Sequence, residues 1–87
     1  MKTFKLIVST PNGNVIDKEV TVISLRGTEG SLAVMANHIP FITTTKAGEV
    51  KINTGSEELL ANASSGILTV TKENVTLLCG EFEIKKS

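Results

Sequence analysis

The segment GTEGSLAVMANHIPFI, residues 27–42, interrupts the simple strand pattern that the chain shows on either side of it. Gly27 and Gly30 stand three positions apart, a spacing typical of a tight exposed turn between paired strands. A short apolar run follows at residues 32–35. Pro40 then removes a backbone donor and favours extended geometry before it, which predicts an edge strand or a corner. We expect the functional surface to lie in this stretch.

Strand-like alternation continues outward from this stretch in both directions. Phe4, Leu6 and Val8 alternate with Lys5, Ile7 and Ser9, as in a strand with at least one buried face, and residues 49–52 alternate charged with β-branched side chains. Residues 18–26 form the longest β-like run, and toward its end both faces are apolar. We therefore expect residues 18–26 to be one continuous strand through the middle of the domain.

Turn residues separate these runs at regular intervals. Gly, Asn, Pro and Ser gather at residues 10–14, 53–56 and 64–66. The one segment with helix-favouring composition, residues 57–62, is short, uncapped and flanked by Gly and Ser. Short strands joined by such turns indicate an all-β sandwich or closed barrel. The length of 87 residues predicts a single domain over residues 1–87.

Composition excludes several classes of function. Nine Lys and Arg balance nine Asp and Glu, and this neutrality argues against nucleic acid as a partner, because phosphate binding needs an excess of positive charge. Aromatic residues make up 3% of the chain, too few for stacking platforms on bases or sugars. We find no apolar run long enough to span a bilayer, so direct membrane insertion is not expected.

The chain contains few residues that could carry out catalysis. It has one histidine, His38, one cysteine, Cys79, and one aspartate, Asp17, and nothing in their spacing brings them together. Cys79 suits a small apolar filler in a strand, and His38 suits a loop residue that hydrogen-bonds across a bend. A cysteine-dependent hydrolase using both residues is the weaker alternative. A metal site would need more converging ligands than one His and one Cys, and we expect no cofactor.

The remaining feature is apolar surface around residues 32–35 and 39–42. A small sandwich has two faces to cover and few residues to cover them, so some of these side chains should stay exposed. Met35 and Phe41 are residue types that are common at protein interfaces. The chain therefore favours a binding or assembly domain, and the alternative from another class is a stand-alone sandwich that binds a small ligand in a concave apolar pocket.

The order of these motifs resembles the epsilon subunit of F-type ATP synthases. A Gly-x-x-Gly turn precedes a Leu-small-aliphatic run, an x-x-His-x-Pro bend and a later glycine before Val-x-Ile. The matching positions are Gly27, Gly30, Leu32, Val34, His38, Pro40, Gly48, Val50 and Ile52. Residues 65–70 and 74–78 match that family's Gly-Gly-Ile/Phe-x-x-Val and Asn-x-Val-Thr-x-Leu patterns, so the resemblance covers nearly the whole chain.

The resemblance implies a fold and a role. The fold is a small β-sandwich or flattened barrel of about ten short strands in two five-stranded sheets. The role is that of a non-catalytic central-stalk subunit, which couples the catalytic head to the membrane ring of c subunits in ion-driven ATP synthesis. Such a subunit binds the gamma subunit and rests on the c-ring, as a peripheral part of the complex on the cytoplasmic face of the bacterial plasma membrane.

The resemblance also implies contact residues. Candidates for contact with the c-ring are Glu29, Gly30, Ser31, Asn37 and His38. Candidates for contact with the gamma subunit are Met35, Pro40, Phe41 and Leu78. No catalytic residue and no metal ligand is implied.

The chain departs from the family pattern at several positions. Ser31 stands where many members carry an acid, which weakens any salt link to an arginine of the ring loops. Ala33, Ala36 and Asn37 stand where Gly, Pro and Gly are common. The family usually continues into a helical hairpin that inhibits ATP hydrolysis in many members and binds ATP in some. The sequence ends at Ser87 without it, so we expect no ATP binding here, whether that hairpin is naturally absent or trimmed.

Overall fold

Ten strands account for the architecture of the computed structural model, which describes residues 2–27, 30–36 and 39–85. The strands are β1 (Phe4–Thr10), β2 (Gly13–Val20), β3 (Val22–Gly27), β4 (Gly30–Met35), β5 (Phe41–Thr45), β6 (Gly48–Asn53), β7 (Glu58–Ala63), β8 (Gly66–Val70), β9 (Asn74–Cys79) and β10 (Phe82–Ile84). The described residues contain no helix, and residues 57–62 contribute to β7. The all-β prediction is confirmed.

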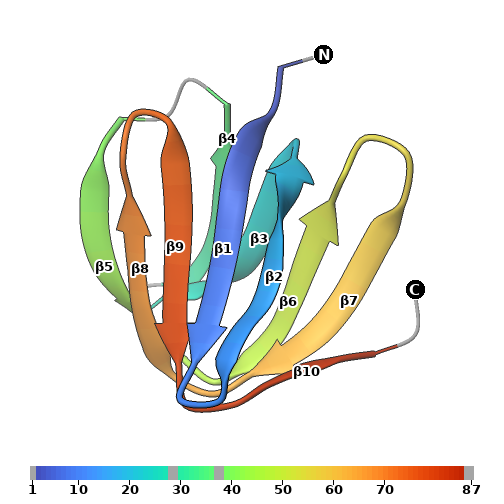
Figure 1. Ribbon diagram of the computed structural model, residues 1–87. Helices are drawn as coiled ribbons and strands as arrows, with labels where there is room; N and C mark the ends of the chain where they lie inside the picture. The colour runs from blue at the N-terminus through green and yellow to red at the C-terminus, as the bar shows by residue number, and fades with distance from the viewer. Residues whose placement is uncertain (1, 28–29, 37–38, 86–87) are drawn as a thin grey trace.

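The strands form two halves of five (Figure 1). One half has the order β5-β8-β9-β1-β2, and the other has the order β4-β3-β6-β7-β10. Strand pairing joins the halves at one place, where Gly27 of β3 pairs with Thr45 of β5. The pair β1–β9 is parallel, and the other paired strands are antiparallel. The predicted pair of five-stranded sheets is thus confirmed, with the two sheets continuous through this corner into a nearly closed barrel.

The core lies between the two halves, because each strand turns every second side chain inward. Most of its large, fully buried side chains belong to the half that contains β1, β2, β8 and β9, and two, Ile23 and Ile52, belong to the other half. Together these large buried side chains are Leu6, Ile23, Ile52, Leu68, Leu77, Val8, Val20, Val70 and Val75. Phe41 and Phe82 are partly buried and pack against this cluster.

The prediction of one strand over residues 18–26 is wrong. The run divides at Thr21, so that Val20 ends β2 in one half and Val22 begins β3 in the other. The Thr21 backbone N–H donates to the Asn53 carbonyl over 2.7 Å, and its hydroxyl donates to the same carbonyl over 3.0 Å. These bonds satisfy polar groups at the crossing, where a buried threonine would otherwise leave them unpaired. β-propensity alone does not reveal that the chain changes sheets.

The predicted Gly-x-x-Gly hairpin is present. Gly27 pairs with Gly30, and the register continues along β3 and β4 to Val22 and Met35. Gly30 has a φ of 127°, in the left-handed region where a side chain would be strained. Residues 28–29 and 37–38 lie outside the described part of the chain, so the predicted bend at Asn37 and His38 is not described.

Pro40 precedes β5 immediately, as an edge position would require. Within the described residues, β5 pairs along its length only with β8 and touches β3 at the single Gly27–Thr45 pair. β4 pairs only with β3. The prediction of an edge strand or corner at Pro40 is confirmed.

Candidate protein-docking surface

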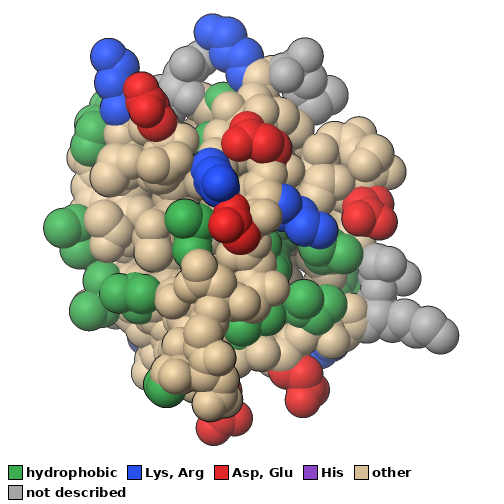
Figure 2. Space-filling model, in the orientation of Figure 1, with side chains coloured by type: hydrophobic (Ala, Val, Ile, Leu, Met, Phe, Trp, Pro, Cys, Tyr) green, Lys and Arg blue, Asp and Glu red, His purple; other side chains and the backbone are tan. Residues whose placement is uncertain are grey.

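One outward face of the molecule carries no charged side chain over several strands. Strand register places Ile42, Thr69, Thr76 and Ile7 in one row across β5, β8, β9 and β1. A second row consists of Thr44, Ile67, Leu78 and Ser9. We call these eight residues the uncharged face. Figure 2 shows this side of the molecule, with charged side chains gathered at its borders.

The aliphatic side chains of this face are well exposed. Ile42 is 72% exposed, and Ile67 and Leu78 are 45% and 48% exposed. Single exposed aliphatic residues are common on soluble proteins, but aliphatic residues in register on adjacent strands form a patch. The threonines between them add β-branched bulk and hydroxyl groups without charge. The face therefore suits contact with another protein surface that is itself low in charge.

A salt bridge marks the border of the uncharged face. Lys5 Nζ lies 3.0 Å from Asp17 Oδ1, between β1 and the neighbouring β2. Both side chains are about half exposed, so the pair contributes little to stability, by about 1 kcal/mol or less. It places the nearest formal charges at the edge of the patch.

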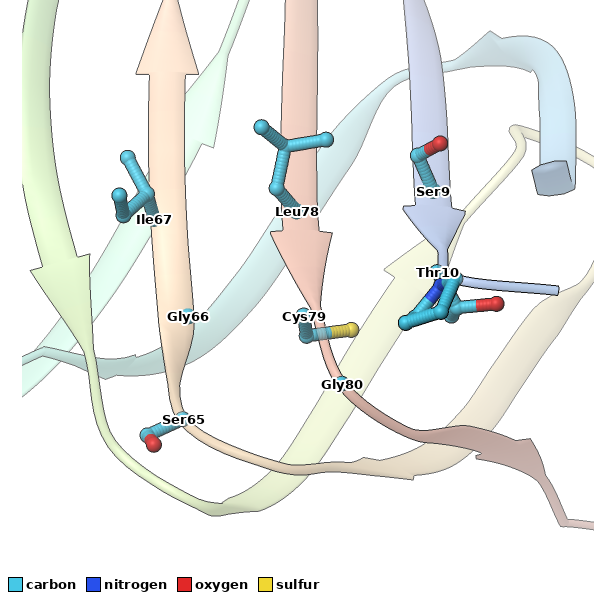
Figure 3. Close-up of a pocket in the computed structure, with 9 residues that line it drawn as sticks. Ser9, Thr10, Ser65, Gly66, Ile67, Leu78, Cys79 and Gly80 are labelled. Carbon is cyan, nitrogen blue, oxygen red and sulfur yellow. The ribbon is translucent and has the colours of Figure 1, made fainter. Parts of the chain in front are cut away.

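The lower end of the uncharged face is hollowed (Figure 3). The hollow is open to solvent and has a volume of about 440 Å³. Ile67, Leu78 and Ser9 stand side by side on β8, β9 and β1, and the chain bends below them at Gly80. The hollow is mostly apolar and open on one side, so it suits a projecting side chain of a partner better than it encloses a free small ligand.

Gly66 brings β8 and β9 close together under this hollow. A Cβ atom at Gly66 would collide with the Leu78 carbonyl oxygen and lie 3.0 Å from the Cys79 Cβ. Ser64 stabilises the bend next to it, because its hydroxyl oxygen accepts the backbone N–H groups of Gly80 at 3.0 Å and Glu81 at 2.9 Å. The shape of the hollow therefore depends on a glycine and on a serine that caps the bend.

The outward face of the other half is charged. Arg26 of β3, Glu49 and Lys51 of β6, and Glu83 of β10 all point away from the core. Lys85 Nζ lies 3.3 Å from Glu49 Oε2 across this face. We call these five residues the charged face. Both signs are represented, as on an ordinary solvated surface.

The predicted contact residues fall in different places. Leu78 belongs to the uncharged face, whereas Met35 is 59% exposed on β4 of the other half. Pro40 is exposed, and Phe41 is half-buried against the core. The structure thus places Pro40 and Phe41 beside the uncharged face through β5, and leaves Met35 apart from it.

Of the residues predicted to meet the c-ring, Gly30 and Ser31 are described. Both are exposed at the start of β4, next to the Gly27–Gly30 turn. Glu29, Asn37 and His38 lie outside the described residues. Part of the predicted corner is therefore at the surface.

Sequence reasoning included Ile42 in the apolar stretch 39–42 without naming it as a contact, and it missed Ile67; both are central to the uncharged face. A signal was available, because β5, β8 and β9 contain no Asp, Glu, Lys or Arg at any position. A solvated strand usually places charged or strongly polar groups on its outer side. Alternation of aliphatic residues with threonine could have indicated a covered outer face.

Cys79 lies at the base of the hollow, and its environment does not favour a reactive thiol. It is 8% exposed, and this burial raises the pKa of the thiol. A raised pKa lowers the fraction of thiolate, which is the nucleophilic form. Among the described residues, no three His, Cys, Asp or Glu side chains are grouped as metal ligands would be. The environment of Cys79 is that of a packed core residue.

Known proteins share both the sequence pattern and the fold. Residues 3–85 match the family described as "ATP synthase, Delta/Epsilon chain, beta-sandwich domain". The sodium ion specific ATP synthase epsilon chain of Propionigenium modestum is 38% identical over 81 residues, which are 93% of this chain and 59% of that relative. The epsilon chain of Bacillus velezensis is 34% identical over 87 residues, which are 100% of this chain and 66% of that relative. The chain thus spans 59–66% of the length of these two relatives.

Two solved structures share the architecture at low sequence identity. A chain of the Euglena gracilis mitochondrial ATP synthase, in a structure of OSCP, F1 and c-ring, aligns with a TM-score of 0.88 at 18% identity, over 94% of this chain and 53% of that one. A chain of the Tetrahymena thermophila central stalk and c-ring aligns with a TM-score of 0.80 at 14% identity, over 93% and 66%. At such identities the likeness shows the fold. Among the described residues, none forms a helix that could cross a membrane.

Proposed function

Because this chain belongs to the family of ATP synthase delta/epsilon chain β-sandwich domains, we propose that it is a non-catalytic rotor component that couples the catalytic head to the c-ring. Its partners in this proposal are the gamma subunit and the c-ring. It is held at the membrane through the ring, as a peripheral part on the cytoplasmic face in a bacterium. The observation that carries the proposal is the uncharged face, which has the character of a docking surface.

The uncharged face is the proposed contact with the gamma subunit. The centres of protein interfaces are depleted of charged residues and rich in apolar ones, and a polar rim surrounds them. Ile42, Ile67 and Leu78 supply the apolar centre, and the Lys5–Asp17 pair lies at the rim. The hollow beside Ile67 and Leu78 gives this centre a shape into which one partner side chain can fit.

The proposed contacts with the c-ring are the exposed corner at Gly30 and Ser31 at the start of β4, with Glu29 before it in the sequence, and Asn37 and His38, which follow the other end of that strand in the sequence. This corner is polar, which suits the polar loops of a membrane ring. Glu29, Gly30 and Ser31 include no basic residue, and His38, beyond the other end of β4 in the sequence, is the one basic candidate. Contact with the c-ring there would depend on shape complementarity and on hydrogen bonds.

The chain would act as a stiff coupling element. A packed core has the density of an organic crystal and deforms little, so a force applied at the corner reaches the docking face without being absorbed. Bond-making chemistry is not part of this role. The raised pKa of Cys79 agrees with a structural use of the only thiol.

A binding experiment with matched variants tests the gamma contact. Leu78→Lys places a charge in the centre of the uncharged face, and Asn62→Lys places one at an exposed position of β7 on the opposite side. We expect Leu78→Lys to weaken binding to purified gamma subunit by roughly 30-fold or more, as a change of about 2 kcal/mol at an interface centre does. Asn62→Lys should bind as the parent does. Failure of the parent to form a complex in size-exclusion chromatography would contradict the proposal.

A second experiment tests the ring contact in the assembled ATP synthase. His38→Ala should reduce the coupling of ATP hydrolysis to ion pumping and leave the unfolding transition of the isolated chain unchanged. The ratio of ions pumped to ATP hydrolysed, measured in membrane vesicles, reports this coupling. An unchanged ratio would assign His38 a structural role only.

A further inference from the structure

The two halves end in four strand edges, and these edges differ in how they resist further pairing. β2 carries Asp17, Lys18 and Glu19 in succession, and Lys18 stands in register with the buried Leu6, a position where a core residue would be expected. β10 carries Glu83 and is followed at once by Lys85. Charges at an edge, above all inward-pointing ones, disfavour the addition of another strand. Both of these edges are therefore protected.

The edges of β4 and β5 lack this protection. Neither strand contains Asp, Glu, Lys, Arg or Pro. Among the described residues, β4 pairs only with β3, and β5 meets β3 at the Gly27–Thr45 pair alone. Backbone N–H and C=O groups on the outer edge of each strand thus face no other strand for most of its length.

A cleft separates these two edges. It is lined by Gly27, Gly30, Ser31 and Leu32 on one side and by Phe41, Ile42 and Thr43 on the other, and its volume is about 340 Å³. None of these side chains is charged. Both walls end in a strand edge, so an occupant that is itself an extended chain can offer backbone groups to either wall.

We propose that the cleft between β4 and β5 accepts one extended, uncharged segment of the central-stalk partner, as an added strand. This inference rests on the proposed function, since it names how the gamma subunit is held. Ile42 belongs both to the uncharged face and to the cleft wall, so a partner that covers the face reaches the cleft without a break. The uncharged lining selects against Lys, Arg, Asp and Glu in the inserted segment, because a charge there would be desolvated without a partner.

Amide hydrogen exchange of the chain, free and in complex with purified gamma subunit, tests the inference. We expect the amides of residues 31–35 and 41–44 that point away from their paired strand to exchange roughly tenfold or more slowly in the complex. The exposed edge of β2 should exchange at the same rate in both states. A complex that forms with the exchange of β4 and β5 unchanged would overturn the inference and leave the proposed function standing. Absence of a complex would overturn both.

A pair of variants supplies the second test. Thr43→Lys places a charge in the cleft, and Asn62→Lys places one at an exposed position of β7, away from both the cleft and the uncharged face. Thr43→Lys should weaken gamma binding by roughly tenfold or more, whereas Asn62→Lys should not, and the circular dichroism spectra of both variants should match that of the parent. Equal affinity of both variants would overturn the inference.

The same parent and variant proteins also identify which molecule occupies the cleft. Light scattering of the isolated chain should give the mass of a monomer. A dimer that Thr43→Lys dissociates would assign the cleft to a second copy of this chain, and would overturn the assignment to the stalk partner.

Discussion

The uncharged face and the charged face cover the same core and are built from strands of similar length, yet they present different chemistry to solvent. Thr69 and Ile67 point outward from β8, where Glu49 and Lys51 point outward from β6. Buried inward-facing residues of both halves are mostly aliphatic. This difference indicates that the inward-facing residues specify the sandwich. The outward-facing residues of each strand specify which side another protein can cover.

The contrast extends to the strand edges. Charged residues protect the edges of β2 and β10 against pairing with another strand, and none occurs in β4 or β5. The unprotected edges adjoin the uncharged face through Ile42. A charged, solvated surface and the surface proposed to be covered by a partner thus divide the molecule between them.

The largest effect is expected at Gly66, which holds β8 against β9 beneath the uncharged face. In Gly66→Ala the new methyl group would collide with the Leu78 carbonyl oxygen, a backbone atom that cannot rotate away. We expect the free energy of unfolding to fall by about 3 kcal/mol or more, as measured by urea denaturation. The control is Gly80→Ala, whose new Cβ would meet the Ser64 hydroxyl oxygen at 3.4 Å. If both variants lose the same stability, the uncharged face does not depend on this close approach.

A smaller effect is expected when the ion pair of the charged face is removed. In Lys85→Met the pair with Glu49 is lost, but both side chains are about half exposed and solvated. The free energy of unfolding should fall by about 0.5 kcal/mol at low salt, and the difference should vanish at high salt. Urea denaturation at two salt concentrations measures it. A loss above about 2 kcal/mol would mean that the charged face is structural, which would weaken the contrast between the faces.

The smallest effect concerns the pH dependence caused by Cys79, beneath the uncharged face. Its pKa is raised by desolvation in the folded chain, so the unfolded chain loses the proton first as pH rises. Stability should therefore fall between the unfolded pKa, about 8.5, and the higher folded value. Below that interval Cys79 makes no difference to the slope.

The variant Cys79→Ala isolates this effect. It should be less stable than the parent at neutral pH, but its stability should decline less steeply above pH of about 8.5. Chemical denaturation at several pH values gives both slopes. Identical slopes would show that the thiol is equally solvated in the folded and unfolded chains.

Much of the fold could be predicted because local chemistry determines it. Alternation marks β1 and β6, and the Gly27–Gly30 spacing marks the hairpin that joins β3 and β4. The passage from β2 to β3 could not be predicted, because residues on both sides of Thr21 favour strands equally and the Asn53 carbonyl that binds it is remote in sequence. Pairing partners, rather than propensity, decide where such a strand divides.

The candidate site was predictable only in part. Leu78 was placed at an interface from the family resemblance, Ile42 was part of an apolar stretch expected to be partly exposed, and Ile67 was read only as part of a strand. Which face of an apolar strand meets solvent depends on the sheet that covers it, and β5, β8 and β9 are apolar or hydroxylic on both faces. The absence of charge in these strands was the usable signal.

The most direct measurement uses the rate of thiol alkylation at single positions on the two faces, with and without purified gamma subunit. Thr44→Cys lies in the uncharged face and Asn62→Cys on the opposite side, both at exposed positions, while the native Cys79 is buried. We predict that gamma slows alkylation of Thr44→Cys by roughly tenfold or more and leaves Asn62→Cys unchanged. Equal rates at Thr44→Cys in the free chain and in the complex would contradict the assignment of the uncharged face to the gamma subunit.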